Sequence, residues 1–331
     1  MALSATARLT VALYACLVAW PCLAQTQYAV LIGGLGGSPE YTGTLRQYLF
    51  DAHAALVGPL GFEESNVTVL SEPATAGEPV VDAIANAENI RAAFTALAGL
   101  VTPQDQVYVV LFGHGSFDGR DAMLNIARRD LSSADYALLI NALPAARIVF
   151  VNTASASAPF VAALSAPERV VITATRSGTQ RNQTIFPRFF VEALSSPSAD
   201  LDRDGSLSVL EVFNYAAIQT AGHFEGEGLL ATEHPLIDDT GDGEGTRLEQ
   251  LRDSQDGHLA AVTFLRRPSL EGATKMLTAM QQSKEAIEHE IAALKARKST
   301  MNVDAYYDEL EVLMLRLARL NNSMDRERGS L

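Results

Sequence analysis

Cysteine and tryptophan are nearly absent from this chain of 331 residues. Both cysteines, Cys16 and Cys22, and the single tryptophan, Trp20, lie within the first 24 residues. If that segment is removed, the remaining chain contains no thiol. It then has no disulfide bond, no thiolate metal site and no cysteine nucleophile, which excludes the common thiol-based functions.

The first 24 residues have the pattern of a secretory signal. A single basic residue, Arg8, precedes an apolar run from Leu9 to Leu23, and the small residue Ala24 follows. This arrangement predicts cleavage after Ala24 and export to the periplasm or the medium. A membrane anchor is the alternative, but the apolar run is short for a bilayer span, so we expect no stable span after cleavage.

Basic residues are scarce relative to acidic ones. The chain has 25 Lys and Arg residues against 39 Asp and Glu residues, a formal net charge of −14, and the leader contains one of the basic residues and none of the acidic ones. Affinity for nucleic acids depends on neutralising phosphates, so this composition argues against a nucleic-acid partner. It favours an exported protein that binds cations.

Apolar runs typical of strands alternate with helical patterns between residues 28 and 223. This alternation predicts an α/β fold in which helices cover both faces of a mostly parallel sheet, a three-layer sandwich. The predicted strands are 28–33, 67–70, 106–112, 147–151 and 169–173, and the predicted helices are 45–57, 88–100, 134–143 and 160–164. Three strands end in small polar segments, GGLGGS, GHGSFDG and NTASAS. Sites in such sheets form at these strand ends.

The C-terminal part of the chain has a different pattern. Between residues 269 and 325, apolar residues recur every three or four positions in two stretches that are separated near residues 299–302. This spacing predicts two helices that form an antiparallel hairpin or a coiled coil. The apolar stripes either pack on each other and on the domain, or mediate dimerisation or partner docking. We therefore divide the chain into a signal (1–24), a main domain (25–265) and a hairpin region (266–331).

The segment DLDRDGSLSVLE, residues 200–211, matches the twelve-residue loop with which EF-hands bind Ca²⁺. Helical patterns at 186–194 and 210–220 flank it, as this type of loop requires. Gly205 occupies the position of the sharp turn. The predicted calcium ligands are Asp200, Asp202, Asp204, Ser206 through its backbone carbonyl, Ser208 and Glu211. Because these carboxylates would repel one another without metal, we expect Ca²⁺ to stabilise the fold.

A second acidic stretch, DDTGDGEGTRLE, covers residues 238–249. It can be aligned with the same template, but Gly245 stands where an aliphatic residue is needed, and no helical pattern clearly precedes it. A surface turn rich in Gly and Asp is the favoured interpretation. A second cation site is the alternative.

His114 lies between two glycines at the end of the third predicted strand, where an accessible imidazole is a candidate general base. Together with the strand YAVLIGG, the helix DAHAAL and the small residues after the fourth strand, this motif makes residues 27–224 resemble the caspase/legumain-like cysteine peptidases, above all bacterial secreted members. The resemblance implies that His114 is the base, that the backbone of Gly115 holds the oxyanion, and that a cysteine nucleophile follows the fourth strand.

The chain departs from that family at the nucleophile, because Ala154 stands where the resemblance places the cysteine. Thr153 and Ser155 flank this position, and a hydroxyl could replace the thiol only within hydrogen-bond reach of a base. Asp118 is a candidate to orient His114 and is equally well interpreted as an aspartate of a turn. Arg46 is either a basic residue of a substrate pocket or a solvated surface arginine, and Arg176 and Arg181 are candidates for the same pocket. Ser157 is expected to cap the following helix.

The sequence favours an exported peptidase homologue that is catalytically inactive. It would act as a calcium-stabilised scaffold that binds a protein or peptide partner, with possible homo-oligomerisation through residues 269–325. One alternative is an active endopeptidase that uses Ser155 or Thr153 with His114. The other is a calcium-dependent structural protein in which the peptidase-like cleft is a relic.

Overall fold

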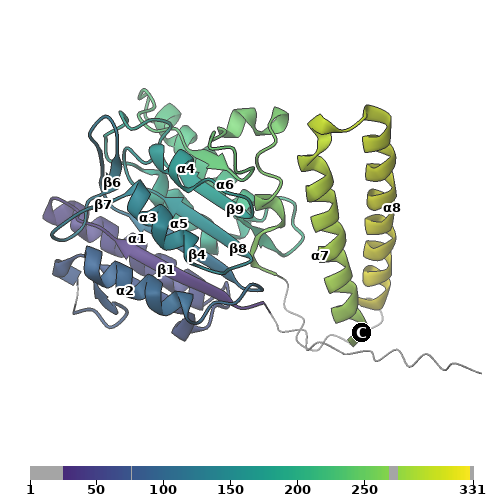
Figure 1. Ribbon diagram of the computed structural model, residues 1–331, viewed down its shortest axis with the longest axis horizontal. Helices are drawn as coiled ribbons and strands as arrows, with labels where there is room; N and C mark the ends of the chain where they lie inside the picture. Colours follow the sequence, from purple (N-terminus) through teal and green to yellow (C-terminus); the bar gives the residue numbers. More distant parts are fainter. Residues whose placement is uncertain (1–24, 76, 268–274, 329–331) are drawn as a thin grey trace, which may run out of the picture.

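The computed structural model describes residues 25–75, 77–267 and 275–328 (Figure 1). The predicted signal, residues 1–24, lies outside the described residues. A seven-stranded sheet with the strand order β11-β9-β8-β4-β1-β2-β3 forms the centre, and its edge strand β11 is antiparallel to β9 while the other pairs are parallel. The strands are β1 (Gln27–Gly33), β2 (Val67–Ser71), β3 (Ala83–Ile84), β4 (Gln106–Phe112), β8 (Arg147–Asn152), β9 (Arg169–Thr173) and β11 (Leu236–Asp238).

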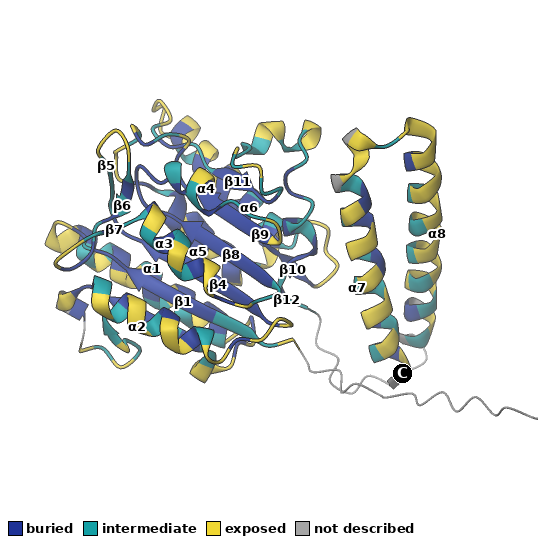
Figure 2. Ribbon diagram, in the orientation of Figure 1, coloured by how far each residue is buried: buried dark blue, intermediate teal, exposed yellow. Residues whose placement is uncertain are grey.

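Helices cover both faces of this sheet, so the predicted α/β fold with a mostly parallel sheet is confirmed. Alternate strand residues point to opposite faces, where they meet different helices. One face packs against α1 (Pro39–Val57), α5 (Phe186–Ser195) and α6 (Val209–Gly226). The other face packs against α2 (Ala87–Ala98), α3 (Ser133–Asn141) and α4 (Pro159–Leu164). Burial on both faces explains why β4, with the sequence QVYVVLF, is buried at every position (Figure 2).

Helix α1 begins at Pro39, six residues before the predicted start. The side chain of Ser38 accepts a hydrogen bond from the backbone N–H of Tyr41, and Pro39 fits the first helical turn because its missing N–H needs no partner there. Because of this cap, α1 begins soon after β1 and includes Tyr41 in its first turn.

Several short elements were not predicted, because two or three residues are too few for a periodic pattern. After β4, the strands β5 (Gly115–Phe117), β6 (Ala122–Leu124) and β7 (Leu131–Ser132) form a separate antiparallel sheet. A second small sheet pairs β10 (Leu207–Ser208) with β12 (Phe264–Arg266). Short 3-10 helices are η1 (Glu64–Asn66), η2 (Pro73–Thr75), η3 (Pro197–Ala199), η4 (Leu248–Asp253), η5 (Ala260–Val262) and η6 (Lys298–Thr300).

The predicted C-terminal hairpin is also present, formed by α7 (Lys275–Ala296) and α8 (Val303–Arg328) (Figure 1). The two helices pack along each other, and α7 also contacts η5 of the main domain. The stripe residues that become buried are Leu277, Ile287, Ile291, Leu294, Tyr306 and Met324. Across the three described ranges, no helix combines the length and apolar character needed to cross a membrane.

Candidate functional site

The carboxyl ends of β1, β4 and β8 meet at one edge of the sheet, and His114 lies at this edge. The N–H of Gly34, after β1, donates to the Phe112 carbonyl at the end of β4 (2.7 Å). The His114 Nε2 atom lies 3.2 Å from the Gly36 carbonyl oxygen, to which it donates, and the Tyr41 ring packs on the imidazole with centroids 4.5 Å apart. Burial lowers the pKa of His114, so its neutral form is favoured at pH 7.

Of the two interpretations of Asp118, an orienter of His114 or an aspartate of a turn, the structure supports the second. The Asp118 Oδ1 atom accepts hydrogen bonds from the backbone N–H groups of Arg120 and Asp121, both at 2.8 Å, and the side chain is fully exposed. Asp118 is therefore a turn residue. Among the described residues, the group that accepts a hydrogen bond from the His114 imidazole is the Gly36 carbonyl.

Ser155 belongs to the segment that follows β8, residues 153–158, which we call the strand-end loop. Its hydroxyl donates to the Gly115 carbonyl (3.1 Å) and accepts from the Gly115 N–H (3.2 Å), and the residue is 2% exposed. A Cβ atom on Gly115 would lie 2.0 Å from the Ser155 carbonyl oxygen, so glycine is required there. The N–H that the family resemblance assigns to an oxyanion is thus bonded within the chain.

Thr153 and Ala154 are also enclosed. The Thr153 hydroxyl donates to the Leu111 carbonyl at 2.7 Å, and Thr153 is fully buried. The Ala154 N–H donates to Asn152 Oδ1 (3.0 Å), and its methyl group packs, fully buried, in the core on the α2–α3–α4 side. Neither residue presents a reactive atom to solvent.

Ser157 does not cap α4, contrary to the prediction. Its hydroxyl lies 3.1 Å from the Thr175 hydroxyl, and the cap position is occupied by Ala158, without a side-chain bond. The loop after β9 closes over the same place, because the Ala156 N–H donates to the Gln180 carbonyl (2.7 Å). These contacts tie the strand-end loop to the loop after β9.

The three arginines proposed for a substrate pocket lie on the surface. Arg46 forms an ion pair with Glu78 at 2.9 Å on the surface of α1. The Arg181 guanidinium donates to the Phe117 carbonyl (2.8 Å), and the side chain is exposed, like that of Arg176. Their recorded interactions are those of surface residues.

Glu233 is a buried acidic residue that the sequence did not indicate. Its carboxylate accepts hydrogen bonds from the N–H groups of Ile185 (2.7 Å) and Phe186 (3.2 Å) at the start of α5. Burial raises its pKa to about 7, although these two hydrogen bonds oppose the shift. No local pattern around Glu233 identifies it, because its partners lie almost 50 residues earlier in the chain.

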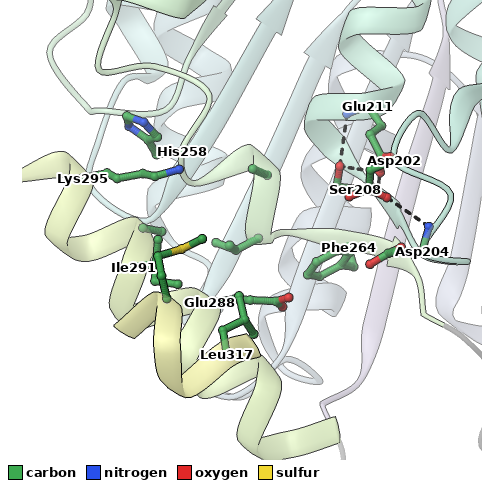
Figure 3. A pocket seen from close by; sticks show the side chains of 14 residues that line it. Asp202, Asp204, Ser208, Glu211, His258, Phe264, Glu288, Ile291, Lys295 and Leu317 are labelled. Carbon is green, nitrogen blue, oxygen red and sulfur yellow. Dashed lines mark hydrogen bonds between the residues drawn. The ribbon is translucent and has the colours of Figure 1, made fainter. Parts of the chain in front are cut away.

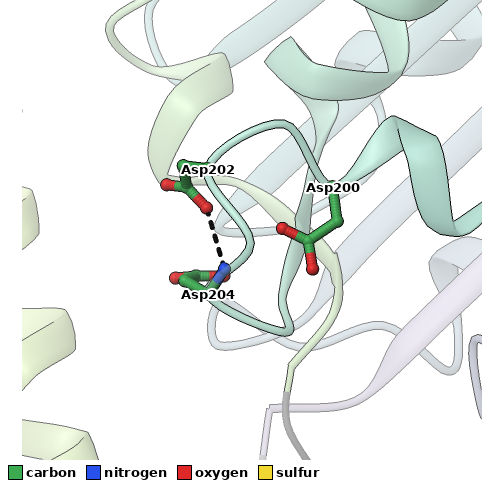
Figure 4. A group of neighbouring side chains, drawn as sticks. All are labelled: Asp200, Asp202 and Asp204. Carbon is green, nitrogen blue, oxygen red and sulfur yellow. Dashed lines mark hydrogen bonds between the residues drawn. The ribbon is translucent and has the colours of Figure 1, made fainter.

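The predicted calcium segment, residues 200–211, follows η3, includes β10 and ends in the first turn of α6; we call it the aspartate loop (Figure 4). Carboxylate oxygens of Asp200, Asp202 and Asp204 lie within 4.8 Å of one another. Gly205 adopts the left-handed conformation (φ 83°), and its N–H donates to Asp200 Oδ2 at 3.0 Å. The other oxygen, Asp200 Oδ1, is buried and has no hydrogen-bond partner among the described residues. Converging hard oxygen donors and a buried oxygen without a partner fit a Ca²⁺ ion.

The remaining predicted ligands hold the loop together. Glu211 Oε2 accepts from both the N–H and the hydroxyl of Ser208, each at 2.8 Å, and Oε1 accepts from the Leu201 N–H (2.9 Å). Ser208 and Glu211 form a capping box that starts α6. The N–H of Ser206 donates to Asp204 Oδ1 (2.7 Å). The structure therefore brings the three aspartates together and leaves Glu211 beside them, bonded to the loop backbone.

The second acidic stretch forms a partly buried turn network. Asp238 lies in β11, and its Oδ1 accepts from the N–H groups of Thr240 and Gly241, both at 3.1 Å. The Asp239 carboxylate accepts from two further N–H groups, and burial raises its pKa to about 6. Glu249 lies in η4 and pairs with Arg247. Within the described part of the chain, the cluster of three converging metal-ligating groups is that of the aspartate loop.

This chain matches no protein-family model and no curated protein. Two features of the structure therefore bear on function. They are the hydroxyls of the strand-end loop, which are hydrogen-bonded within the chain, and the converging carboxylates of the aspartate loop.

Proposed function

We propose that this chain is an exported, calcium-stabilised scaffold that binds a protein or peptide partner and does not hydrolyse peptide bonds. Its main domain would be a caspase/legumain-like peptidase frame in which the nucleophile has been lost. The observation that carries this proposal is the hydrogen bonding of Thr153 and Ser155, whose hydroxyls both donate to backbone carbonyls.

Peptide hydrolysis by a hydroxyl requires an acceptor that takes its proton and an open path to the substrate. Ser155 is 2% exposed and its hydroxyl donates to the Gly115 carbonyl, while the His114 imidazole donates to the Gly36 carbonyl. Ala154 offers only a buried methyl group. These features favour loss of catalysis over the alternative of a serine or threonine endopeptidase.

Turnover of a fluorogenic peptide library tests the catalytic half of the proposal. The library includes Asp, Asn and Arg at the position before the cleaved bond. We expect no turnover above the rate of a His114→Ala variant. Turnover that this substitution abolishes would restore the endopeptidase alternative.

The calcium half of the proposal is supported by the convergence of the three aspartates. A ligand that binds the native state alone stabilises it by about 2.7 kcal/mol at a hundredfold excess over its Kd. We expect Ca²⁺ to raise the melting temperature of the wild-type chain by several degrees and Asp200→Asn to abolish the increase. Asp242→Asn, an exposed aspartate in the second acidic stretch, is the matched control and should retain it.

A further inference from the structure

Helix α7 lies against the aspartate loop and brings charged side chains to it. Lys284 Nζ is 3.4 Å from Asp204 Oδ2 and 3.6 Å from Glu288 Oε1, one helical turn further along α7. Arg267, just after β12, pairs with Glu285 on the same helix. The hairpin therefore contacts the loop through the Lys284–Asp204 ion pair, which joins residues 80 positions apart in the sequence.

A cavity of about 240 Å³ separates the loop from the helix at this point (Figure 3). Asp202, Asp204 and Glu211 line its loop side, and Glu288 and Ile291 line its α7 side. In Figure 3, the Glu288 carboxylate extends from α7 toward the loop. A cation held by the aspartates would therefore lie close to charges that the hairpin supplies.

We propose that α7 completes the cation site of the aspartate loop, with Lys284 opposing and Glu288 favouring a bound divalent cation. This inference rests on the calcium binding proposed above. Lys284 neutralises Asp204 in the absence of metal, so a cation must share that carboxylate with an ammonium group of the same sign. Glu288 adds a negative charge beside the cavity without belonging to the loop motif.

The two charges predict opposite effects on affinity, which isothermal titration of the full chain with CaCl₂ measures. A charged side chain a few ångströms from a bound cation changes its affinity through the Coulomb interaction, which solvent partly screens. We expect Lys284→Met to bind Ca²⁺ roughly 5- to 10-fold more tightly than the wild type, and Glu288→Gln to bind more weakly by a similar factor. The double variant should return close to the wild-type affinity.

Matched controls carry the same charge changes elsewhere on the hairpin. Lys298→Met alters an exposed lysine of η6, and Glu290→Gln alters the partner of Arg316 on α8. Both should leave the Ca²⁺ affinity unchanged. If the wild type binds no Ca²⁺, the proposed function and this inference both fail. If it binds while Lys284→Met and Glu288→Gln equal the wild type, the role of α7 alone is refuted.

A second, independent observation concerns the outer face of α8. The residues of this helix that pack inward are Tyr306, Leu310, Leu313, Leu317, Leu320 and Met324. The opposite face is exposed and includes Val312, 59% exposed, and Leu315, 47% exposed. At 1.5 Å per residue, α8 offers a straight surface about 39 Å long.

Charge is segregated along this exposed face. Asp304, Asp308 and Glu311 precede Leu315, and Arg319 and Arg326 follow it, all of them exposed. An antiparallel copy of the same helix, centred on Leu315, would oppose Glu311 to Arg319 and Asp304 to Arg326 on both sides of the symmetry axis. Such a self-complementary arrangement is the property of an isologous twofold interface.

We infer that a second copy of this chain pairs with α8 in the antiparallel orientation. This pairing identifies a partner for the proposed scaffold and does not depend on cation binding. Sedimentation velocity of the full chain should show a dimer that weakens with salt. Glu311→Arg and Arg319→Glu should each give monomers, and the double charge swap should restore the dimer.

Glu225→Arg, on the exposed surface of α6, is the control for charge reversal and should remain dimeric. A monomeric wild type would refute the interface. A dimer that is indifferent to both single reversals would place the contact on another surface and would equally refute it.

Discussion

The strand-end loop and the aspartate loop both combine small residues with polar side chains, yet their polar atoms have different partners. In the strand-end loop, the hydroxyls of Thr153, Ser155 and Ser157 all interact with other groups of the chain. In the aspartate loop, three carboxylates converge, and one buried oxygen of Asp200 has no partner among the described residues. Both loops are held by internal hydrogen bonds, but only in the aspartate loop do carboxylates converge around a buried oxygen that accepts no hydrogen bond from the described residues.

This difference matters more than residue type in deciding where a ligand binds. A hydroxyl that is bonded within the chain costs little to bury, and its proton is already engaged. Converging carboxylates repel one another, and a cation relieves this repulsion. A strand end with serine and threonine looks reactive in sequence, but its hydroxyls are bonded within the chain, and we therefore propose the acidic loop as the binding site.

The largest loss of stability should come from a side chain at Gly115, because the strand-end loop packs directly on this glycine. Gly115→Ala would drive a Cβ atom into the Ser155 backbone, which cannot move without disrupting β8. We expect a loss of at least about 4 kcal/mol in the free energy of unfolding, measured by urea denaturation. Gly43→Ala in α1, where a Cβ would meet no atom within 4 Å, should be neutral or stabilising. Equal effects would mean that the strand-end loop has room to relax.

The free energy of unfolding should depend on pH through the buried carboxyl of Glu233. Its pKa of about 7 in the folded chain exceeds the ordinary value of 4.5, so the native state holds this proton more tightly than the unfolded state. The resulting stabilisation is complete below pH 4.5 and is lost as the pH rises through 7. It amounts to about 3 kcal/mol at most.

Comparison of unfolding free energies at pH 4.5 and pH 8 measures this contribution. The wild type should lose more stability over this range than Glu233→Gln, whereas the exposed Glu244→Gln should follow the wild type. Parallel pH profiles for wild type and Glu233→Gln would show that Glu233 titrates normally.

A pair of polar substitutions compares the two loops directly. Ser155→Ala leaves the N–H and carbonyl of Gly115 without their partner, so we expect a loss of about 2 kcal/mol. In chelator, Asp202→Asn should cause no loss of stability, because it removes one of the repelling charges while its side-chain oxygen can still accept the Asp204 N–H. Similar losses in both variants would contradict the distinction between the two loops.

The smallest effect on stability should come from placing a thiol at Ala154, where the family resemblance would place a cysteine. In a chain that begins at residue 25, Ala154→Cys would carry the sole cysteine, fully buried in the core. We expect its reaction with a disulfide reagent to be roughly 100-fold slower or more in the native state than in urea. Ala221→Cys, on the exposed surface of α6, should react at once. Rapid reaction of the Ala154→Cys thiol would indicate an open strand end.

Sequence patterns predicted the elements that bury many residues in succession. The strands β1, β4 and β8 are apolar on both faces, and the stripe of α7 recurs at helical spacing, so local periodicity reveals them. The contacts that define the sites are of another kind. Ser155 meets Gly115 across 40 residues, and Lys284 meets Asp204 across 80. Such pairs depend on how strands and helices assemble, which no local pattern records.

The two-strand ladder of β10 and β12 has a mechanical consequence. The chain that leads to the hairpin leaves the main domain directly after β12, and β12 pairs with β10, which belongs to the aspartate loop. The strands are antiparallel and only two to three residues long. A pulling force on the C-terminal helices would therefore reach this ladder before any strand of the central sheet, and the aspartate loop would be the first part of the domain to bear the load.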